Sequence, residues 1–214
     1  MEMAEYLGRA VARLKAKGIG NTSRYAFHVI KERTLASALD LRFGGKLCAT
    51  NLNERVYKNG AHTMVHSAYH ILRDIFAQVP ISKDDVLVDV GCGEGRVINF
   101  WLSRGLKNQI IGLEIVPDVA KRTRERYLKY PNVSIIEGDA IKNAPPNGTI
   151  FFLYNPFSAD KVPLFERAVR DFRPTIVYYQ NNYMDAFDRR YWIVTAIHPR
   201  GRVYEFQAAV IKPR

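Results

Sequence analysis

The segment Val86–Arg96, which reads VLVDVGCGEGR, constrains the fold of this chain more than any other. Apolar residues on both sides of Asp89 predict a buried strand, and the closely spaced glycines after it predict a tight turn into a helix. In open α/β sheets, ligands bind outside the carboxyl ends of the strands, where glycine lets the backbone approach without a Cβ in the way. The segment therefore predicts a ligand site at the end of a parallel strand.

Short β runs alternate with helical patterns from Asp84 onward, which predicts an α/β fold with a doubly wound, mostly parallel sheet. His198-Pro199-Arg200-Gly201 lies between the last two β runs and indicates a closing hairpin, so one sheet edge should be antiparallel. The predicted strands are Val86–Val90, Gln109–Ile115, Val133–Glu137, Thr149–Tyr154, Thr175–Tyr179, Tyr191–Ile197 and Val203–Ile211. The predicted helices among them are Arg96–Ser103, Pro117–Lys129 and Val162–Phe172.

The first 82 residues have a different character, because they read as helices and Lys and Arg outnumber Asp and Glu in them. Helices are predicted over Ala4–Lys17, over Ser23–Leu41 and from about His62 to Ala77. We interpret residues 1–82 as a basic helical N-terminal extension that forms a lid over the substrate, and residues 83–214 as the core domain.

The 214 residues suffice for one sizeable core, and their formal net charge of +11 favours anionic partners such as RNA or an acidic metabolite. The two cysteines, Cys48 and Cys92, imply no disulfide framework. No apolar run is long enough for a signal peptide or a membrane span, so we expect a cytoplasmic protein without transmembrane association.

Two kinds of cofactor could use the glycine turn. A dinucleotide needs G-x-G-x-x-G, but here the third glycine, Gly95, comes one residue early and Arg96 takes the required position. S-adenosylmethionine has no phosphate, and its charged amino acid end can be held by an acidic strand end such as Asp89, directly or through water. The turn therefore favours S-adenosylmethionine over a nicotinamide dinucleotide and its oxidoreductase chemistry.

Polar residues at the ends of the next strands support this choice. Glu114 ends the second strand, where a carboxylate can accept from both hydroxyls of a ribose. Asp139 follows the third strand and is placed for the adenine amino group. The fourth strand ends in Tyr154-Asn155-Pro156-Phe157, beside the position expected for methyl transfer.

Residues 85–180 resemble the core of class I S-adenosylmethionine-dependent methyltransferases, and Asp89–Arg96 is similar to their glycine motif. Together with Ile111-Gly-Leu-Glu114 and Leu153-Tyr-Asn-Pro-Phe157, this motif resembles that of small bacterial members of the family. The resemblance implies a seven-stranded sheet whose last strand is antiparallel, and S-adenosyl-L-methionine as the cofactor. On this basis, the expected cofactor-binding residues are Asp89, Gly91, Cys92, Gly93, Arg96, Glu114, Ile115, Asp139, Ala140 and Asn155.

The fourth-strand motif departs from that of many amino-group methyltransferases, which carry Asn/Asp-Pro-Pro-Tyr/Phe. Asn155-Pro156-Phe157 is one proline short, so the acceptor atom is left open between nitrogen and oxygen. We expect these three residues to form the catalytic corner, where Asn155 orients the acceptor and Phe157 shapes its slot for an in-line displacement.

Candidate substrate residues lie outside the strand-end motifs. His62, His66 and His70 repeat every four residues on one helix face, which favours a polar or partly buried face over a metal site. The resemblance places that helix over the pocket, so His66, Ser67 or Tyr69 could line it, and Tyr183 could reach the substrate mouth. Two sets of basic residues are expected to be solvated: Lys121, Arg122, Arg124, Arg126 and Lys129, and then Arg167, Arg170 and Arg173.

The methyl acceptor stays open at this level, with a small molecule or glycan ranked about level with protein or RNA. A basic extension favours RNA, yet no RNA-binding module accompanies it. The alternative from another class is a non-catalytic protein that binds S-adenosylmethionine and regulates or scaffolds. The complete Asn155-Pro156-Phe157 corner argues against that alternative.

Overall fold

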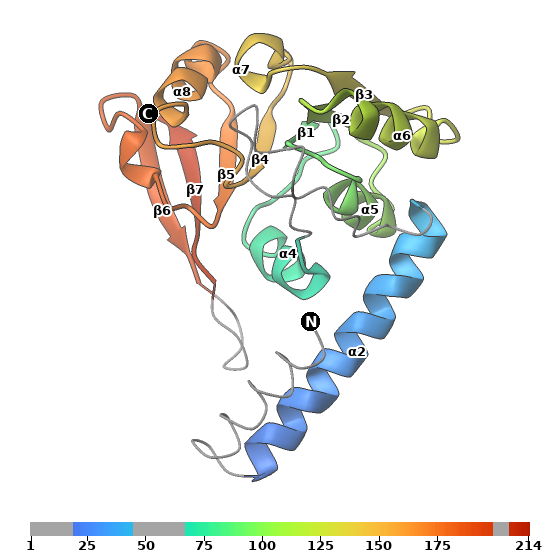
Figure 1. The fold of residues 1–214 in the computed structure, drawn as a ribbon. Helices are drawn as coiled ribbons and strands as arrows, with labels where there is room; N and C mark the ends of the chain where they lie inside the picture. Colours follow the sequence, from blue (N-terminus) through green and yellow to red (C-terminus); the bar gives the residue numbers. More distant parts are fainter. Residues whose placement is uncertain (1–18, 45–66, 199–205) are drawn as a thin grey trace. The chain divides into compact units, whose positions relative to one another are not determined.

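The computed structural model describes residues 19–44, 67–198 and 206–214 (Figure 1). The chain divides into two compact units, Met1–Ala38 and Leu39–Arg214. Helix α2 (Ile19–Phe43) crosses this division, so its last turn belongs to the second unit. The predicted helix over Ala4–Lys17 lies outside the described residues, and the lid role of residues 1–82 stays a prediction.

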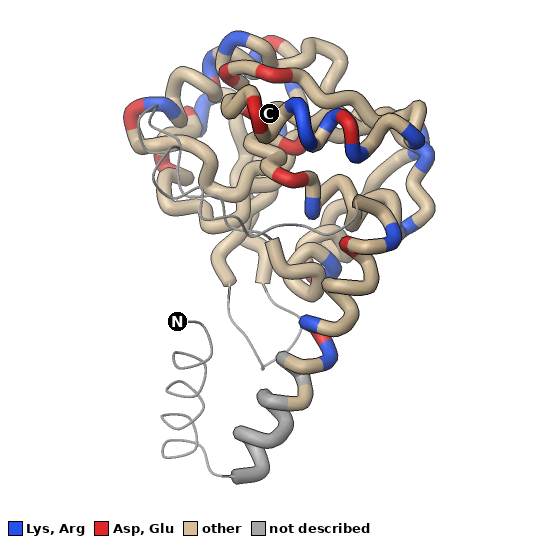
Figure 2. Tube along the Cα trace, turned by 45° about the vertical axis from the view of Figure 1, so that its right-hand side comes forward, with Lys and Arg blue, Asp and Glu red and all other residues tan. Residues whose placement is uncertain are grey.

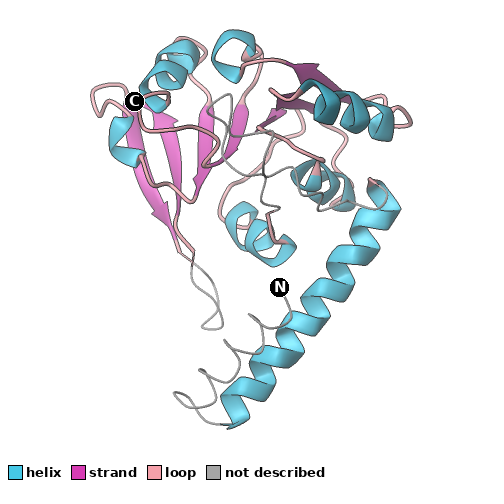
Figure 3. Ribbon diagram, viewed as in Figure 1, coloured by secondary structure: helices cyan, strands magenta, loops and turns pink. Residues whose placement is uncertain are grey.

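The second unit is built on a seven-stranded sheet in the order β3-β2-β1-β4-β5-β7-β6, which confirms the expected fold class (Figure 3). The first five strands are parallel, and β7 is antiparallel to both β5 and β6. The chain order reverses between β1 and β4, so the crevice expected at such a switch point lies at their carboxyl ends. The strands are β1 (Val86–Val90), β2 (Gln109–Glu114), β3 (Val133–Glu137), β4 (Ile150–Tyr154), β5 (Thr175–Tyr179), β6 (Trp192–Ile197) and β7 (Ala208–Pro213).

Helices cover both faces of this sheet because its central strands are apolar on both sides. In β4, Phe152 packs against Phe76 with ring centroids 5.8 Å apart, whereas the neighbouring Phe151 faces Phe165 at 6.1 Å on the other side. Phe76 belongs to α4 and Phe165 to α8. The helices are α4 (Tyr69–Phe76), α5 (Arg96–Ser103), α6 (Pro117–Tyr127), α7 (Ala140–Asn143) and α8 (Val162–Arg170), with a short 3₁₀ turn, η2 (Met184–Ala186).

From β1 to β6 the predicted element boundaries agree with the structure to within a residue or two. Before β1, α2 begins at Ile19 instead of Ser23, and α4 begins at Tyr69, after the extended Ala68, instead of near His62.

Strand β7 begins at Ala208 and ends at Pro213, later than the predicted Val203–Ile211. Its position is set by long-range pairing, with Ile211 opposite Ile176 and Pro213 opposite Trp192. Residues 199–205, which hold most of the predicted hairpin turn, lie outside the described residues.

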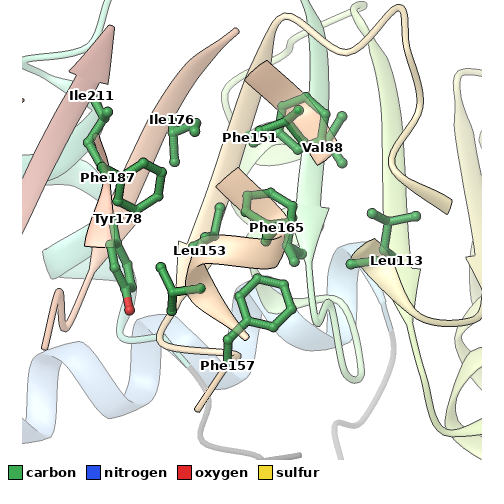
Figure 4. Close-up of a cluster of buried hydrophobic side chains, with 14 of the residues drawn as sticks. Val88, Leu113, Phe151, Leu153, Phe157, Phe165, Ile176, Tyr178, Phe187 and Ile211 are labelled. Atoms are coloured by element: carbon green, nitrogen blue, oxygen red, sulfur yellow. The ribbon is translucent and has the colours of Figure 1, made fainter. Parts of the chain in front are cut away.

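One apolar cluster fills the face of the sheet under α7 and α8 (Figure 4). Phe157, directly after β4, belongs to this cluster and packs against Phe165 with ring centroids 5.0 Å apart. The cluster thereby extends to the carboxyl edge of the sheet, where the predicted site lies. Within the described part of the chain, no helix is both long and apolar enough to cross a membrane.

Candidate active site

The turn between β1 and α5 adopts the left-handed backbone that its glycines permit. The φ angles of Gly91, Gly93 and Gly95 are 73°, 53° and 87°. The backbone N–H groups of Gly91 and Cys92 both donate to the Leu113 carbonyl, at 2.9 Å each, which ties the turn to the end of β2. The loop therefore has the tight, close-approach conformation expected from the sequence.

Helix α6 binds the carbonyl side of this loop. Thr123 donates to the Gly93 carbonyl at 2.8 Å and Tyr127 to the Gly95 carbonyl at 2.7 Å. Between them, Arg126 donates to the intervening carbonyl, that of residue 94, at 2.5 Å. Three consecutive carbonyls are thus fixed by one helix, which holds the loop in a single conformation.

The expectation that the basic residues of α6 form a solvated outer face holds for only part of the helix. Arg126 is half-buried against the glycine loop, and Arg124 donates to the Ile135 carbonyl at 3.2 Å. Lys121 and Arg122 are exposed. Lys and Arg elsewhere are spread over several elements, interspersed with Asp and Glu (Figure 2). A helical periodicity shows which face is polar, but it does not show which basic side chains curl back onto a neighbouring loop.

Glu114 ends β2 and its carboxylate is already oriented by the backbone. One oxygen accepts from the Gly93 N–H at 2.8 Å and the other from the Val116 N–H at 2.9 Å. Burial raises the pKa of Glu114, while the N–H groups of Val116, Gly93 and Ile115 oppose that rise. A carboxylate has about four acceptor sites, so beyond these three backbone N–H groups it can still accept from a ligand hydroxyl.

Asp89, at the end of β1, is one of the buried polar residues with an unsatisfied atom. Its side chain is buried, and its Oδ2 has no hydrogen-bond partner among the described residues. Burial, and secondarily the charge of Glu114, raises the pKa of Asp89 to about 8. A buried acceptor without a partner is costly unless a donor arrives, and a ligand ammonium group would supply one. The unpartnered Asp89 oxygen thus fits the ammonium group at the amino acid end of S-adenosylmethionine.

A pocket opens at the carboxyl ends of β1 to β4, with about 430 Å³ of space including its open mouth. Asp139 caps α7, its Oδ1 accepting from the Ile141 N–H at 2.9 Å, which leaves Oδ2 free of that bond. The lining residues combine an apolar wall with few polar groups, as small-molecule sites do. They are Val90, Gly91, Leu113, Ile115, Gly138, Asp139, Ala140, Pro156, Phe157 and Lys161.

The corner after β4 brings the fourth-strand motif to the same pocket. Pro156 and Phe157 line it, and a Cβ on residue 91 would lie 3.3 Å from the Pro156 Cβ, so the glycine loop and the corner nearly touch. Asn155 is half-buried with a φ of 42°, and its Oδ1 accepts from the Tyr178 hydroxyl at 3.1 Å. Tyr178 could not be recognised as a site residue from the sequence, since a buried aromatic in a strand indicates only core packing.

Arg96 and Tyr69 do not line the pocket, because both bind Asp40 in the last turn of α2. The Arg96 guanidinium pairs with Asp40 at 2.7 Å, and the Tyr69 hydroxyl donates to it at 2.5 Å. The Arg96 guanidinium carbon also lies 5.7 Å from the centroid of the Tyr69 ring. Asp40 is buried, yet nothing in the sequence distinguishes it from an acid on a solvated helix face.

The other predicted residues fall in three groups. Gly93 and Cys92 are buried within the loop, and burial raises the pKa of the Cys92 thiol. Tyr183 is half-buried against the apolar cluster beside the corner. His62 and His66 lie outside the described residues, and the described residues contain no group of three or more His, Cys, Asp or Glu that could hold a metal ion.

Comparisons with known proteins agree with this geometry. Residues 87–174 match the family model of a methyltransferase domain. Trans-aconitate 2-methyltransferase of Afipia carboxidovorans is 31% identical over 83 residues, which cover 39% of this chain and 31% of that protein. Ribosomal RNA small subunit methyltransferase A of Thermotoga petrophila is 31% identical over 112 residues, which cover 51% of this chain and 42% of that protein. The chain therefore spans less than half the length of these relatives.

Solved structures share the fold at low sequence identity. A methyltransferase from Pyrococcus furiosus superposes with a TM-score of 0.55 at 12% identity, over 85% of this chain and 97% of that one. An RNA methyltransferase from Salinibacter ruber, in complex with S-adenosylhomocysteine, gives 0.54 at 17% identity, over 70% and 93%.

Residues 87–174 match a methyltransferase domain, and the sheet has the fold of class I, Rossmann-like methyltransferases. The cofactor of that class is S-adenosyl-L-methionine, and the similar structure from Salinibacter ruber is in complex with S-adenosylhomocysteine.

Proposed function

We propose that this protein is an S-adenosylmethionine-dependent methyltransferase that transfers a methyl group to a nitrogen or oxygen atom of its acceptor. The observation that carries the proposal is the unpartnered, buried Oδ2 of Asp89 beside the pocket at the carboxyl ends of the strands. A carboxylate in that position needs a cationic donor, which the cofactor has and a dinucleotide phosphate lacks.

Five of the predicted cofactor residues have proposed roles that their positions support, and Arg96, which binds Asp40, is not among them. Asp89 holds the ammonium end, and the remaining acceptor capacity of the Glu114 carboxylate serves the ribose hydroxyls. The free Oδ2 of Asp139 accepts from the adenine amino group, while Ile115 and Ala140 form apolar walls. When bound, the cofactor supplies an electrophilic methyl group on its sulfonium.

The corner residues act on the acceptor. Asn155 binds and orients it, Pro156 forms the wall that nearly touches the glycine loop, and Phe157 excludes water from the apolar side. Alignment of the acceptor with the methyl carbon is the main requirement of an in-line displacement, so rigid positioning supplies most of the rate enhancement. Tyr183, beside this corner, is the proposed wall of the substrate mouth.

Two observations support a class of acceptor: the names of the relatives and the net charge of the chain. The names of two relatives, one acting on trans-aconitate and one on ribosomal RNA, span a small anionic molecule and a polyanion. The net charge of +11 suits either, so we propose an anionic acceptor.

The test has a binding part and a turnover part. Binding of S-adenosylhomocysteine should raise the melting temperature of the protein, whereas NAD should not, because a ligand stabilises only the state that binds it. Transfer of a tritium-labelled methyl group to components of a cell extract should then be observed. Binding without transfer to any component would instead indicate the non-catalytic alternative, and binding of neither ligand would contradict both.

A further inference from the structure

The side chain of Asn155, after β4, accepts a hydrogen bond from a residue of the neighbouring strand β5. The Tyr178 hydroxyl donates to the Asn155 Oδ1 at 3.1 Å. A phenolic hydroxyl has a single proton, so this bond commits the proton of Tyr178 to Asn155. The acceptor at that point is therefore the amide oxygen, and the amide NH₂ turns the other way.

Backbone geometry makes this arrangement rigid. Tyr154 and Tyr179 are paired in register at the ends of β4 and β5, with ring centroids 4.3 Å apart. The residues that follow them, Asn155 and Gln180, both have left-handed backbones, with φ of 42° and 52°. Such conformations are unfavourable for residues other than glycine and cluster at functional sites. Gln180 is also held by a 2.7 Å bond from its N–H to the Gln207 carbonyl.

We propose that Tyr178 is a positioning residue that turns the Asn155 amide so that its NH₂ group faces the acceptor, and that the acceptor atom is a carboxylate oxygen. This inference rests on the proposed methyltransferase function and narrows it. An amine acceptor would have to share the amide oxygen with the Tyr178 hydroxyl, whereas an oxygen acceptor presents its lone pairs to the NH₂ group, which Tyr178 does not use.

Proton balance separates a carboxylate from a hydroxyl. The carboxylate oxygen forms a bond to the methyl carbon while the sulfur–methyl bond breaks and its electron pair stays on sulfur. The positively charged sulfonium becomes a neutral thioether, the carboxylate becomes a methyl ester, and no proton moves. A hydroxyl would have to lose a proton.

The described side chains that hydrogen-bond or stack at the corner are poor bases for that proton. Asn155 is an amide, and burial raises the pKa of Tyr178 to about 12 and that of Tyr154 above its usual range. Asp139, the carboxylate that lines the same pocket, is the residue proposed to hold the adenine. Lys161 lines the same pocket, and its ammonium group suits an anionic acceptor. A carboxylate needs no base and is attracted by that charge.

The chemical class of the product can be tested before the acceptor is known. Label transferred from S-adenosylmethionine carrying a tritiated methyl group to a cell extract is treated with mild alkali. Methyl esters hydrolyse and release volatile tritiated methanol, whereas N-methyl groups and methyl ethers keep the label. Volatile label supports the proposal, and alkali-stable label overturns it while leaving the methyltransferase function standing. Absence of any transfer contradicts the proposed function, and this inference with it.

Two variants test the positioning role of Tyr178. Tyr178→Phe should lower kcat by about tenfold or more, since a freely rotating amide misplaces the acceptor, with unchanged affinity for S-adenosylhomocysteine. Tyr191→Phe, which removes an exposed hydroxyl, is the control and should behave as wild type. Equal turnover of the two variants would contradict the role of Tyr178.

Asn155→Asp separates orientation from simple contact. An aspartate still accepts from the Tyr178 hydroxyl, so the melting temperature should stay close to that of the wild type. Its negative charge replaces the NH₂ donor, so a carboxylate acceptor is repelled and label transfer should be lost. Retained or increased transfer would mean that the acceptor donates a proton to residue 155, and the proposal would be wrong.

Discussion

The hydroxyl of Tyr127 donates to the Gly95 carbonyl at 2.7 Å, and the same side chain occupies the space that a Cβ on residue 95 would need. Helix α6 and the glycine loop therefore fit together at this point without room for a larger residue. The space taken by Tyr127 explains why residue 95 is a glycine, although Gly95 does not line the pocket.

Gly95→Ala should destabilise the protein by about 3 kcal/mol, because a left-handed backbone strain of about 1–2 kcal/mol adds to an overpacking cost of similar size. Chemical denaturation measures the change. Gly105→Ala is the matched control: its φ of 73° imposes the strain, but nothing lies within 4 Å of the added Cβ. Equal losses in the two variants would show that Tyr127 does not matter.

Glu114→Gln should weaken S-adenosylhomocysteine binding about 10- to 100-fold, since hydrogen bonds to a charged group contribute about 1.5–3 kcal/mol. Isothermal titration calorimetry measures this directly. Glu137→Gln is the control, because Glu137 pairs in register with Glu114 across β2 and β3 but is exposed. A wild-type affinity for Glu114→Gln would remove Glu114 from the proposed cofactor site.

Asp89 should make the stability of the empty protein depend on pH. Its pKa rises from 3.8 in the unfolded chain to about 8 in the folded protein, so between these values the folded state holds a proton that the unfolded state has lost. Stability contributed by this group is present below pH 4 and falls as the pH rises toward 8. Asp89→Asn should flatten that slope and stabilise the empty protein at pH 8 by an amount on the order of a few kcal/mol. An unchanged slope in urea denaturation would contradict the assignment.

Cofactor affinity should show the opposite trend. Between about pH 6 and 7.5 an α-amino group stays largely charged, and binding it requires an ionised Asp89. Affinity for S-adenosylhomocysteine should therefore increase up to tenfold per pH unit over that range, because one proton is released on binding. Calorimetry in buffers of different ionisation enthalpy counts that proton. Asp89→Asn should bind weakly at every pH, and a pH-independent wild type would argue against an ammonium contact.

Asp40→Asn should cost about 3 kcal/mol of stability, because the variant leaves the partly buried Arg96 guanidinium without its counter-charge. Thermal and urea unfolding report the loss. Asp84→Asn, at an exposed turn, serves as the control and should change stability by less than about 0.5 kcal/mol. Comparison with Arg96→Leu then shows whether Arg96 acts on stability or on cofactor affinity, the role that the sequence suggested for it.

Sequence patterns located the sheet well because strand signals are local. Val86–Val90, Val133–Glu137 and Thr175–Tyr179 have the predicted bounds, and so does helix α5. Turn chemistry and apolar runs decide such elements within a few residues. The number of strands and the antiparallel last strand were expected from the family resemblance, whereas the periodicity of a strand does not identify its neighbours in the sheet.

The residues of the site also fall into those that local sequence predicts and those that depend on long-range contacts. Residues at strand ends, such as Glu114 and Asp139, could be predicted because parallel strands bring their carboxyl ends to one edge. Asp40, Thr123 and Tyr178 could not, because each acts through a partner 23 to 56 positions away in the chain. Only packing reveals which buried hydroxyl or carboxylate meets which distant carbonyl or guanidinium.

The insertion of Phe157 into the apolar cluster has a consequence for attempts to enlarge the pocket for bulkier molecules. Its ring is both a wall of the pocket and a neighbour of Phe165 in the interior. A shorter side chain at this position would enlarge the pocket, but it would also leave a cavity beneath α8 and lower the thermal stability of the protein. Lys161, at the rim, offers a safer position for a designer to vary.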